Sequence, residues 1–180
     1  MRDTIVHKAA WKIMRFEAFE HYLAFKDLLA LGYSDEVACG MQAAPVDMTR
    51  FGGNMLLDAG ISLLHDLLVG AGGTAYNNAS ARLGVGDSAT GEAQTQTALQ
   101  AATNKFWRPM EATYPVFTGG SDKSTWRAVF ASGEANYAWN EFTLVNAADD
   151  TGVNLNRKVS AQGTKTAGQT WTLDLEITWS

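Results

Sequence analysis

The chain has 180 residues, 46% of them hydrophobic and 18% charged, so it can bury the core of a folded domain and is not a disordered polypeptide. Its formal net charge of -5 and its scattered basic residues argue against a nucleic-acid partner. No apolar stretch approaches the roughly 20 residues of a membrane span, and we expect no membrane partner. The first residues lack the apolar core of a secretory signal, and the single cysteine, Cys39, excludes a disulfide within the chain.

Residues 1–52 are mixed in pattern. Residues 7–16 have the composition of a strand, and residues 16–31 carry large apolar side chains at near-helical spacing. Gly32 offers a stop, so we expect a helix before it. Residues 33–50 show no period and indicate an irregular loop. We therefore expect residues 1–52 to form an N-terminal arm, a helix-containing attachment segment outside the main domain.

Residues 53–180 are expected to form that domain, and an amphipathic helix is predicted near its start, at residues 54–69. The apolar residues of this helix recur at steps of four, three and four, with Asn54 as the expected N-cap and Gly70 as the stop. A glycine inside a helix costs roughly 1 kcal/mol relative to alanine. Gly60 therefore predicts close packing against another element.

From residue 81 onward, short runs of β-branched and aromatic residues are separated by glycine, asparagine, aspartate and serine. The last run alternates apolar and polar residues almost without fault, which is typical of a strand with one dry face. The pattern predicts a mainly β (α+β) fold, an antiparallel β-sandwich or jelly-roll-like domain. The expected strands are residues 82–86, 106–113, 125–131, 137–145, 155–161 and 170–179.

One glycine-rich segment matches a dinucleotide-binding fingerprint in form, from Gly84 through Gly86 to Ala89. That fingerprint needs a long helix after it, and residues 90–97 lack an amphipathic stripe. We interpret the glycines as positions of tight packing or of a bulge, and we expect no cofactor.

Metal ligands are not grouped in the sequence. His7, His21 and His65 lie far apart and form no ligand motif, so we expect no metal site built from them. Asp149 and Asp150 could coordinate calcium, although the Asp-Asp-Thr-Gly sequence is first of all a good turn.

An enzymatic interpretation has little support, and we expect that the chain is not an enzyme. No nucleophile motif is present, and the carboxylate pair worth testing for polysaccharide cleavage is Glu134 with Glu141. Glu141 lies near Trp139 and could be a buried acid with a raised pKa. The alternative is that Glu141 pairs with Arg127 or Lys158 across strands.

Two blocks resemble small virion structural proteins of tailed bacteriophages, a group of decoration and tail proteins. They are residues 133–146, with the sequence Trp-Asn-Glu-Phe, and residues 154–168, with the sequence Leu-Asn-Arg-Lys. Three earlier segments fit the same pattern, and the resemblance covers about residues 53–180. Residues 1–50 match no segment of this group. The earlier segments are residues 53–60, 81–88 and 95–100.

The resemblance implies a non-enzymatic building block of the virion, made in the host cytoplasm and assembled as a homotrimer. Its expected partners are the major capsid protein and copies of itself. We expect a capsid decoration (cement) protein on the capsid exterior, because an N-terminal arm could lie across neighbouring shell subunits. The alternative is a tail protein, such as a short tail fibre or a receptor-binding module, in contact with other tail proteins.

The contacts with partners are expected in the arm and at sheet edges. Aromatic side chains of the arm are candidate anchors, and the alternative for them is a local core. Basic residues of the later strands are expected to pair with Glu134, Glu141 and Glu176 and to set strand register and subunit pairing. The candidate interface residues are Trp11, Phe16, Tyr22, Phe25, Arg127, Trp139, Glu141, Arg157 and Lys158.

Overall fold

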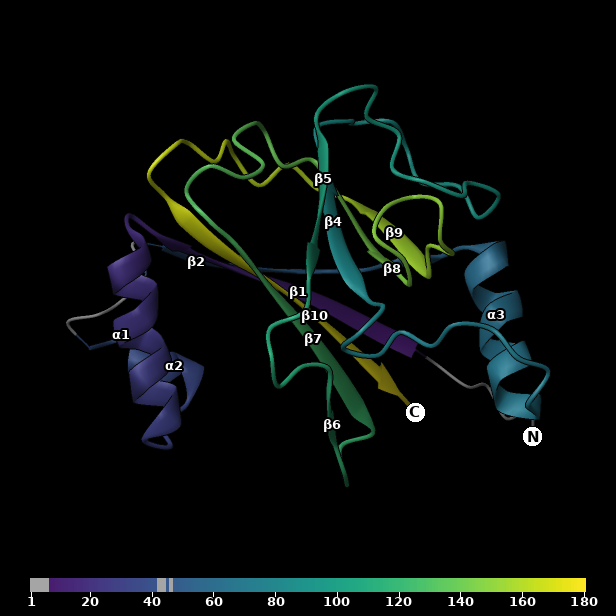
Figure 1. Cartoon of the computed structure of the whole chain (residues 1–180), viewed down its shortest axis with the longest axis horizontal. Helices are drawn as coiled ribbons and strands as arrows, with labels where there is room; N and C mark the ends of the chain where they lie inside the picture. The colour runs from purple at the N-terminus through teal and green to yellow at the C-terminus, as the bar shows by residue number, and fades with distance from the viewer. Residues whose placement is uncertain (1–6, 42–44, 46) are drawn as a thin grey trace.

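The computed structural model describes residues 7–41, 45 and 47–180. Two five-stranded antiparallel sheets pack face to face, with three short helices at their sides (Figure 1), which confirms the expected mainly β, sandwich-like fold. The elements are β1 (His7–Phe16), α1 (Phe19–Ala30), α2 (Asp35–Cys39), β2 (Asp47–Gly52), β3 (Met55–Leu56), α3 (Asp58–Val69), β4 (Arg82–Gly86), β5 (Lys105–Pro109), β6 (Val116–Thr118), β7 (Lys123–Phe130), β8 (Glu141–Val145), β9 (Asn156–Val159) and β10 (Thr170–Trp179).

The first sheet has the strand order β2-β1-β10-β7-β6. Its central pair joins the two ends of the described chain, because β1 lies antiparallel to β10 from His7 opposite Trp179 to Phe16 opposite Thr170. On its other side β1 pairs with β2. The expected arm is therefore wrong for these two strands. They are part of the β domain, and no boundary at residue 52 separates them from it.

The second sheet has the order β3-β9-β8-β4-β5, and the main core lies between the two sheets. Trp139 occupies its centre, with ring centroids 4.8 Å from Phe130 and 4.9 Å from Trp171 in edge-on contacts. Trp11 packs on Phe142 of the opposite sheet. These large rings are fully or almost fully buried, so they hold the two sheets together through apolar burial.

The other face of the first sheet is covered by α1 and α2, which lie together on the left of Figure 1. Met14 and Phe16 point to this face, where they form a second, smaller core with Tyr22 and Phe25 of α1. The predicted helix at residues 16–31 is confirmed with slightly shorter bounds. The irregular segment expected at residues 33–50 is wrong in part, because it contains α2 and most of β2.

Helix α3 confirms two predictions and corrects one. Gly70 ends it in the left-handed conformation, with φ of 73°. A Cβ on Gly60 would lie 2.5 Å from the carbonyl oxygen of Leu155, so the predicted close packing is present. Asn54 is not the N-cap, because the chain first forms β3 against β9 and the helix starts at Asp58.

Of the six strands predicted after residue 81, β4 and β10 have the expected bounds, β7 begins two residues earlier and ends one earlier than predicted, and β5, β8 and β9 are shorter than predicted. β8 shows the reason. It begins at Glu141 and not at residue 137, because the N–H groups of Trp139 and Asn140 donate to the carbonyls of Gly163 and Gly86. Loop contacts thus replace the sheet ladder for these residues, which composition alone does not reveal.

Candidate functional site

In the described residues, oppositely charged side chains are buried together at two places, and Lys165 is buried separately, where its ammonium donates to the Ala131 carbonyl and the Asn136 side chain. We call the first the Glu141 network, which is the pair Glu141 and Arg157 with the groups that they contact on the second sheet. We call the second the Lys12 cluster, which consists of Lys12, Asp35, Arg127 and Asp174 on the outer face of the first sheet. Buried charges are rare unless they are paired, so both places are candidates for a functional site.

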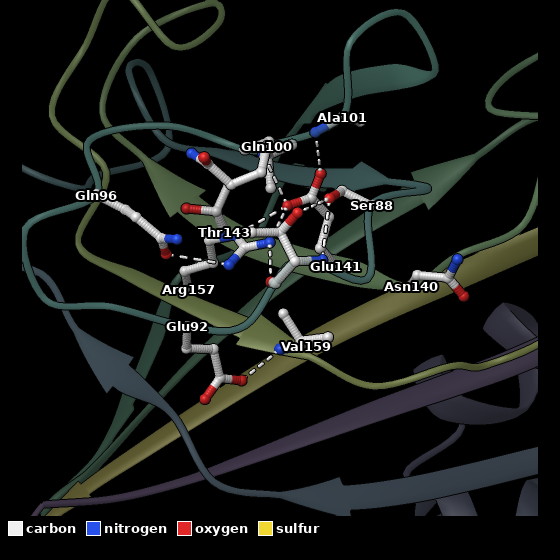
Figure 2. A network of polar contacts seen from close by, with 12 residues as sticks. Ser88, Glu92, Gln96, Gln100, Ala101, Asn140, Glu141, Thr143, Arg157 and Val159 are labelled. Atoms are coloured by element: carbon white, nitrogen blue, oxygen red, sulfur yellow. Dashed lines mark hydrogen bonds and ion pairs between the residues drawn. The ribbon is translucent and has the colours of Figure 1, made fainter.

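Glu141 begins β8 and is 0% exposed. Its carboxylate accepts hydrogen bonds from the backbone N–H groups of Gln100 at 2.9 Å and Ala101 at 2.7 Å. Arg157 of β9 donates another from Nε at 2.8 Å, and its Nη2 lies 2.7 Å from the same oxygen in an ion pair (Figure 2). Both carboxylate oxygens are therefore engaged, Oε1 by the Ala101 N–H and Oε2 by the Gln100 N–H and Arg157.

Arg157 connects Glu141 to the long irregular segment between β4 and β5. Its guanidinium donates to the carbonyl oxygen of Thr90 at 2.9 Å, to that of Gly91 at 3.2 Å and to Oε1 of Gln96 at 3.0 Å. Glu92 adds a second tie, because its carboxylate accepts the N–H of Val159 (Figure 2). The network fastens this segment to the sheet, as a structural network does.

The glycines of β4 make room for these side chains. A Cβ on Gly86 would collide with the Glu141 carboxylate, and one on Gly84 would lie 2.6 Å from Cδ1 of Trp107. The predicted tight packing at both glycines is thus confirmed. Residues 87–104 contain no helix, so the dinucleotide fingerprint lacks the helix N-terminus on which a pyrophosphate would bind.

The Lys12 cluster joins three strands and one helix. Lys12, Arg127 and Asp174 lie on neighbouring strands β1, β7 and β10, and Asp174 receives Lys12 at 2.9 Å and Arg127 at 2.7 and 2.8 Å. Asp35, the first residue of α2, contacts both cations from above the sheet. The cluster therefore holds α2 on the outer face of the first sheet, with two cations balanced by two carboxylates.

The members of the Lys12 cluster tune one another's pKa values. Burial lowers the pKa of Lys12, but Asp174 and Asp35 outweigh it, so the pKa lies above its ordinary value. Burial raises the pKa of Asp35, but Arg127 and Lys12 lower it by more. Burial also lowers the pKa of Arg127. Asp174 and Asp35 stabilise its charged form by more, so the pKa lies well above its ordinary value. These three side chains are thus held in their charged forms at neutral pH.

Two adjoining cavities lie beside the Lys12 cluster, with volumes of about 320 and 210 Å³, and both are lined by Tyr114 and Arg127. Their carboxylates already have cation partners. Glu111 pairs with Lys26 at 2.9 Å, and Glu176 pairs with Lys123 at 3.4 Å. None of the residues lining the two cavities is a histidine, a cysteine or a serine.

The expected interface anchors lie inside the molecule. Trp11, Phe16 and Phe25 are 0% exposed and Tyr22 is 4% exposed, so the local core is the correct interpretation of all four. They are buried because β1 is the second strand of a five-stranded sheet with both faces covered. Trp139, Arg127, Glu141 and Arg157 are buried as well, and only Lys158 is partly exposed.

The expected charge pairs are partly right. Arg157 pairs with Glu141, one of the three glutamates that were expected to pair with basic residues. Arg127 instead pairs with Asp174 and Asp35. Lys158 contacts Glu92 at 3.5 Å. Asp35, Asp174 and Lys12 were not predicted. A sequence signal exists for Asp174 alone, which falls on the polar phase of the alternating strand β10, whereas Lys12 shares its face of β1 with the apolar Met14 and Phe16.

The carboxylates of the two expected acids and of the two candidate calcium ligands all accept hydrogen bonds from groups of the chain itself. Glu134 accepts from Arg108 at 2.9 Å and from the N–H of Ala131 at 2.8 Å. Asp150 accepts from the Leu99 N–H, from the Asn154 amide and from the Lys105 ammonium, while Asp149 closes a turn by accepting the Thr151 N–H. Asp149 therefore takes part in a turn, as the turn interpretation predicts, and the Asp150 carboxylate is paired with the Lys105 ammonium.

No group of three or more histidine, cysteine or acidic side chains suited to a metal ion occurs in the described part of the chain. Within the same residues, no helix combines the length and the apolar composition needed to cross a bilayer. Comparison of the chain with known protein families, with curated proteins and with solved structures finds no match.

Proposed function

We propose that this chain is a structural, non-enzymatic building block of a bacteriophage virion that works by binding copies of itself and neighbouring virion proteins. The proposal rests on the resemblance of residues 133–146 and 154–168 to such proteins. One structural observation supports it. The most specific parts of the two blocks, Trp-Asn-Glu-Phe and Leu-Asn-Arg-Lys, contribute Glu141 and Arg157, the two halves of the buried Glu141 network.

The residues that carry the resemblance therefore act as scaffold. Trp139 fills the centre of the core, and Glu141 and Arg157 fasten a long segment to the second sheet. In a family defined by catalysis, the most specific motif residues would be expected to line a cavity with unpaired reactive groups. Here they are buried and paired, as expected of a protein selected for a stable shape.

The sharper form of the proposal is a trimeric decoration (cement) protein that binds the major capsid protein on the capsid exterior. The capsid location was preferred to the tail because an N-terminal arm was expected to lie across neighbouring shell subunits. Because β1 and β2 are strands of the first sheet, that argument no longer favours the shell over the tail. The proposal common to both locations is a stable β block with surfaces for assembly.

A stop codon early in the gene tests both the role and the location. A shell protein predicts particles that form but release DNA at a lower temperature than parental particles. A tail protein predicts full heads that fail to adsorb or that lack tails. In both cases the chain supplied from a plasmid should restore the parental behaviour. Unchanged particle yield, thermal stability and adsorption would contradict a structural role in the virion.

A further inference from the structure

The larger of the two cavities beside the Lys12 cluster has the features of a small-molecule site. Its volume is about 320 Å³, and its walls are α1, the segment that connects β5 to β6, and Arg127 of β7. Sites for small molecules are mostly apolar hollows in which a few polar groups converge on the ligand. At about 30 Å³ for each water molecule, this cavity has room for roughly ten, which suits a small ligand.

The apolar part of the wall comes from α1. Phe25 is fully buried, Leu29 is partly buried and Ala30 is exposed, so this wall runs from the interior to the surface. The Tyr114 ring adds an aromatic wall, and the guanidinium of Arg127 lies 5.0 Å from its centroid. An apolar group of a ligand would be removed from water in this part of the cavity, which stabilises its binding.

Arg127 contributes a hydrogen-bond donor that the fold does not use. The side chain is 3% exposed, and its Nε and Nη2 donate to the carboxylates of Asp174 and Asp35. A guanidinium carries donors on all three of its nitrogens, yet no residue in the described part of the chain accepts a hydrogen bond from Nη1. A buried donor without an acceptor is costly. Because Arg127 lines both cavities, a ligand oxygen can supply that acceptor.

Glu111 contributes the complementary acceptor. Its Oε1 accepts the hydroxyl of Tyr22 and lies 2.9 Å from the ammonium of Lys26, whereas Oε2 has no partner among the described residues. Glu111 is held next to β7, because its backbone N–H donates to the Arg127 carbonyl at 2.8 Å. The cavity therefore offers an unused cationic donor and an unused anionic acceptor on neighbouring elements.

The charges around the two cavities are balanced before a ligand binds. Four cations and four carboxylates line them: Lys12, Lys26, Lys123 and Arg127, with Asp35, Glu111, Asp174 and Glu176. A ligand with a net charge would leave one charge without a counter-charge at a partly buried place, which is costly. A zwitterion adds one charge of each sign and keeps the balance.

We propose that this cavity binds a free α-amino acid with an apolar side chain, whose carboxylate accepts from Nη1 of Arg127 and whose ammonium donates to Oε2 of Glu111. Its side chain would lie against Phe25, Leu29 and Ala30 of α1. A free α-amino acid carries an ammonium, a carboxylate and a side chain on one carbon atom, so one small molecule meets all three requirements of the cavity. This binding function goes beyond the virion role and does not depend on it.

Titration calorimetry of the full chain at neutral pH tests the proposal. The probes are L-leucine and L-phenylalanine, and three analogues of leucine each lack one feature. Leucinamide lacks the carboxylate, N-acetyl-leucine lacks the ammonium, and glycine lacks the apolar side chain. At least one of the two amino acids should bind, and each analogue should bind about tenfold or more weakly than leucine, because it loses a charge-assisted hydrogen bond or the buried apolar contact.

Two variants assign the binding to this cavity. Glu111→Gln should weaken leucine binding about tenfold and abolish the preference for leucine over N-acetyl-leucine, which a merely structural role of Glu111 would not do. Its matched control is Glu36→Gln, at an exposed carboxylate that pairs with Arg50 outside both cavities. Ala30→Leu should also weaken binding, because the larger side chain fills the cavity.

Ala59→Leu makes the same change at an exposed position of α3 that lines neither cavity, and it should bind leucine as the parent does. The unfolding temperature of each variant, measured with and without leucine, shows whether the variant is folded, because a ligand of the folded state raises that temperature.

Absence of binding for both amino acids at millimolar concentrations would overturn the proposal. Equal affinity for leucine and N-acetyl-leucine would also overturn it, since the ammonium would then have no role. Binding that persists unchanged in Glu111→Gln and in Ala30→Leu would place the amino-acid site elsewhere and contradict this one. The virion role fails separately, through unchanged particles after the stop codon.

Discussion

Replacing Glu141 by glutamine should destabilise the fold strongly, because it removes the anion from a fully buried ion pair. The amide keeps the shape of the carboxylate but cannot accept from Gln100, Ala101 and Arg157 together. Arg157, itself 0% exposed, would lose its buried counter-charge. Removing one partner of a buried pair costs about 3–5 kcal/mol. That is a large fraction of the roughly 5–15 kcal/mol by which a domain is stable.

The loss can be measured by urea and thermal unfolding followed by tryptophan fluorescence. For a chain of this size, about 1 kcal/mol corresponds to roughly 2–4 °C in Tm, so the variant should unfold about 6–20 °C below the parent. The matched control is Glu176→Gln, whose carboxylate contacts Lys123 at 3.4 Å at a partly exposed position. Its expected cost is about 0–1 kcal/mol.

A double-mutant cycle with Arg157→Met separates the pair from its surroundings. If the two side chains act as a unit, the double variant should be more stable than the sum of the single losses predicts, by about 1–3 kcal/mol. A Glu141→Gln variant that loses less than about 1 kcal/mol would refute the scaffold role. Such a variant that kept its stability but lost a polysaccharide-cleaving activity of the parent would support the enzymatic interpretation.

Three further predictions concern packing and pH. Gly60→Ala should lower the free energy of unfolding by about 1–3 kcal/mol, because its methyl group would meet the Leu155 backbone. The control Gly133→Ala has open space around its methyl group and should lose less. Urea unfolding of the two variants measures the difference. Burial lowers the pKa of Lys165 to about 8. Between about pH 8 and the ordinary lysine pKa of 10.5, the unfolded chain binds more protons than the folded chain, so the free energy of unfolding should gain a rise over this range that Lys165→Met lacks. The pKa of Asp35 is lowered by Arg127 and Lys12 against the effect of burial, so its contribution is present above about pH 4 and is lost in acid. Asp35→Asn should be about 2 kcal/mol less stable at neutral pH, with a shallower acid limb in unfolding followed by circular dichroism.

Strands that alternate cleanly could be predicted with their bounds. β10 places Trp171, Leu173 and Leu175 in the core and Thr172 and Asp174 on the other face, which is buried as well, so the alternation of apolar and polar side chains marks the limits of the strand. Where the chain leaves the ladder for a loop, as before β8, the residues are still aromatic or β-branched. Composition therefore overestimates the strand, because it does not report which carbonyl receives each N–H.

The placement of the N-terminal residues could not be derived from local pattern. β1 pairs with β10, which lies more than 150 positions away in the chain, and no local rule reports such a pairing. The C-terminal half of β1 does carry a sequence signal for its burial. Ile13, Met14 and Phe16 place apolar side chains on both faces, which is typical of a strand buried on both sides. That pattern predicts a central strand covered by a helix, in place of an arm.

The charged pair of the Glu141 network could be predicted from the sequence, whereas three members of the Lys12 cluster and the backbone donors around Glu141 could not. Glu141 and Arg157 stood out as charged residues beside aromatic and branched ones, and they do form a pair. What sequence could not supply is that the N–H groups of Gln100 and Ala101 complete the shell around the carboxylate. These donors lie in an irregular segment without a periodic pattern, so their position depends on the tertiary fold.

Counting the copies of the chain in purified particles tests the central claim most directly. Quantitative mass spectrometry against the major capsid protein should find it at a fixed ratio after washing in high salt, with hundreds of copies for a shell protein or a handful for a tail component. Particles that contain none of it, from a host that makes the folded chain in abundance, would contradict a structural role in the virion.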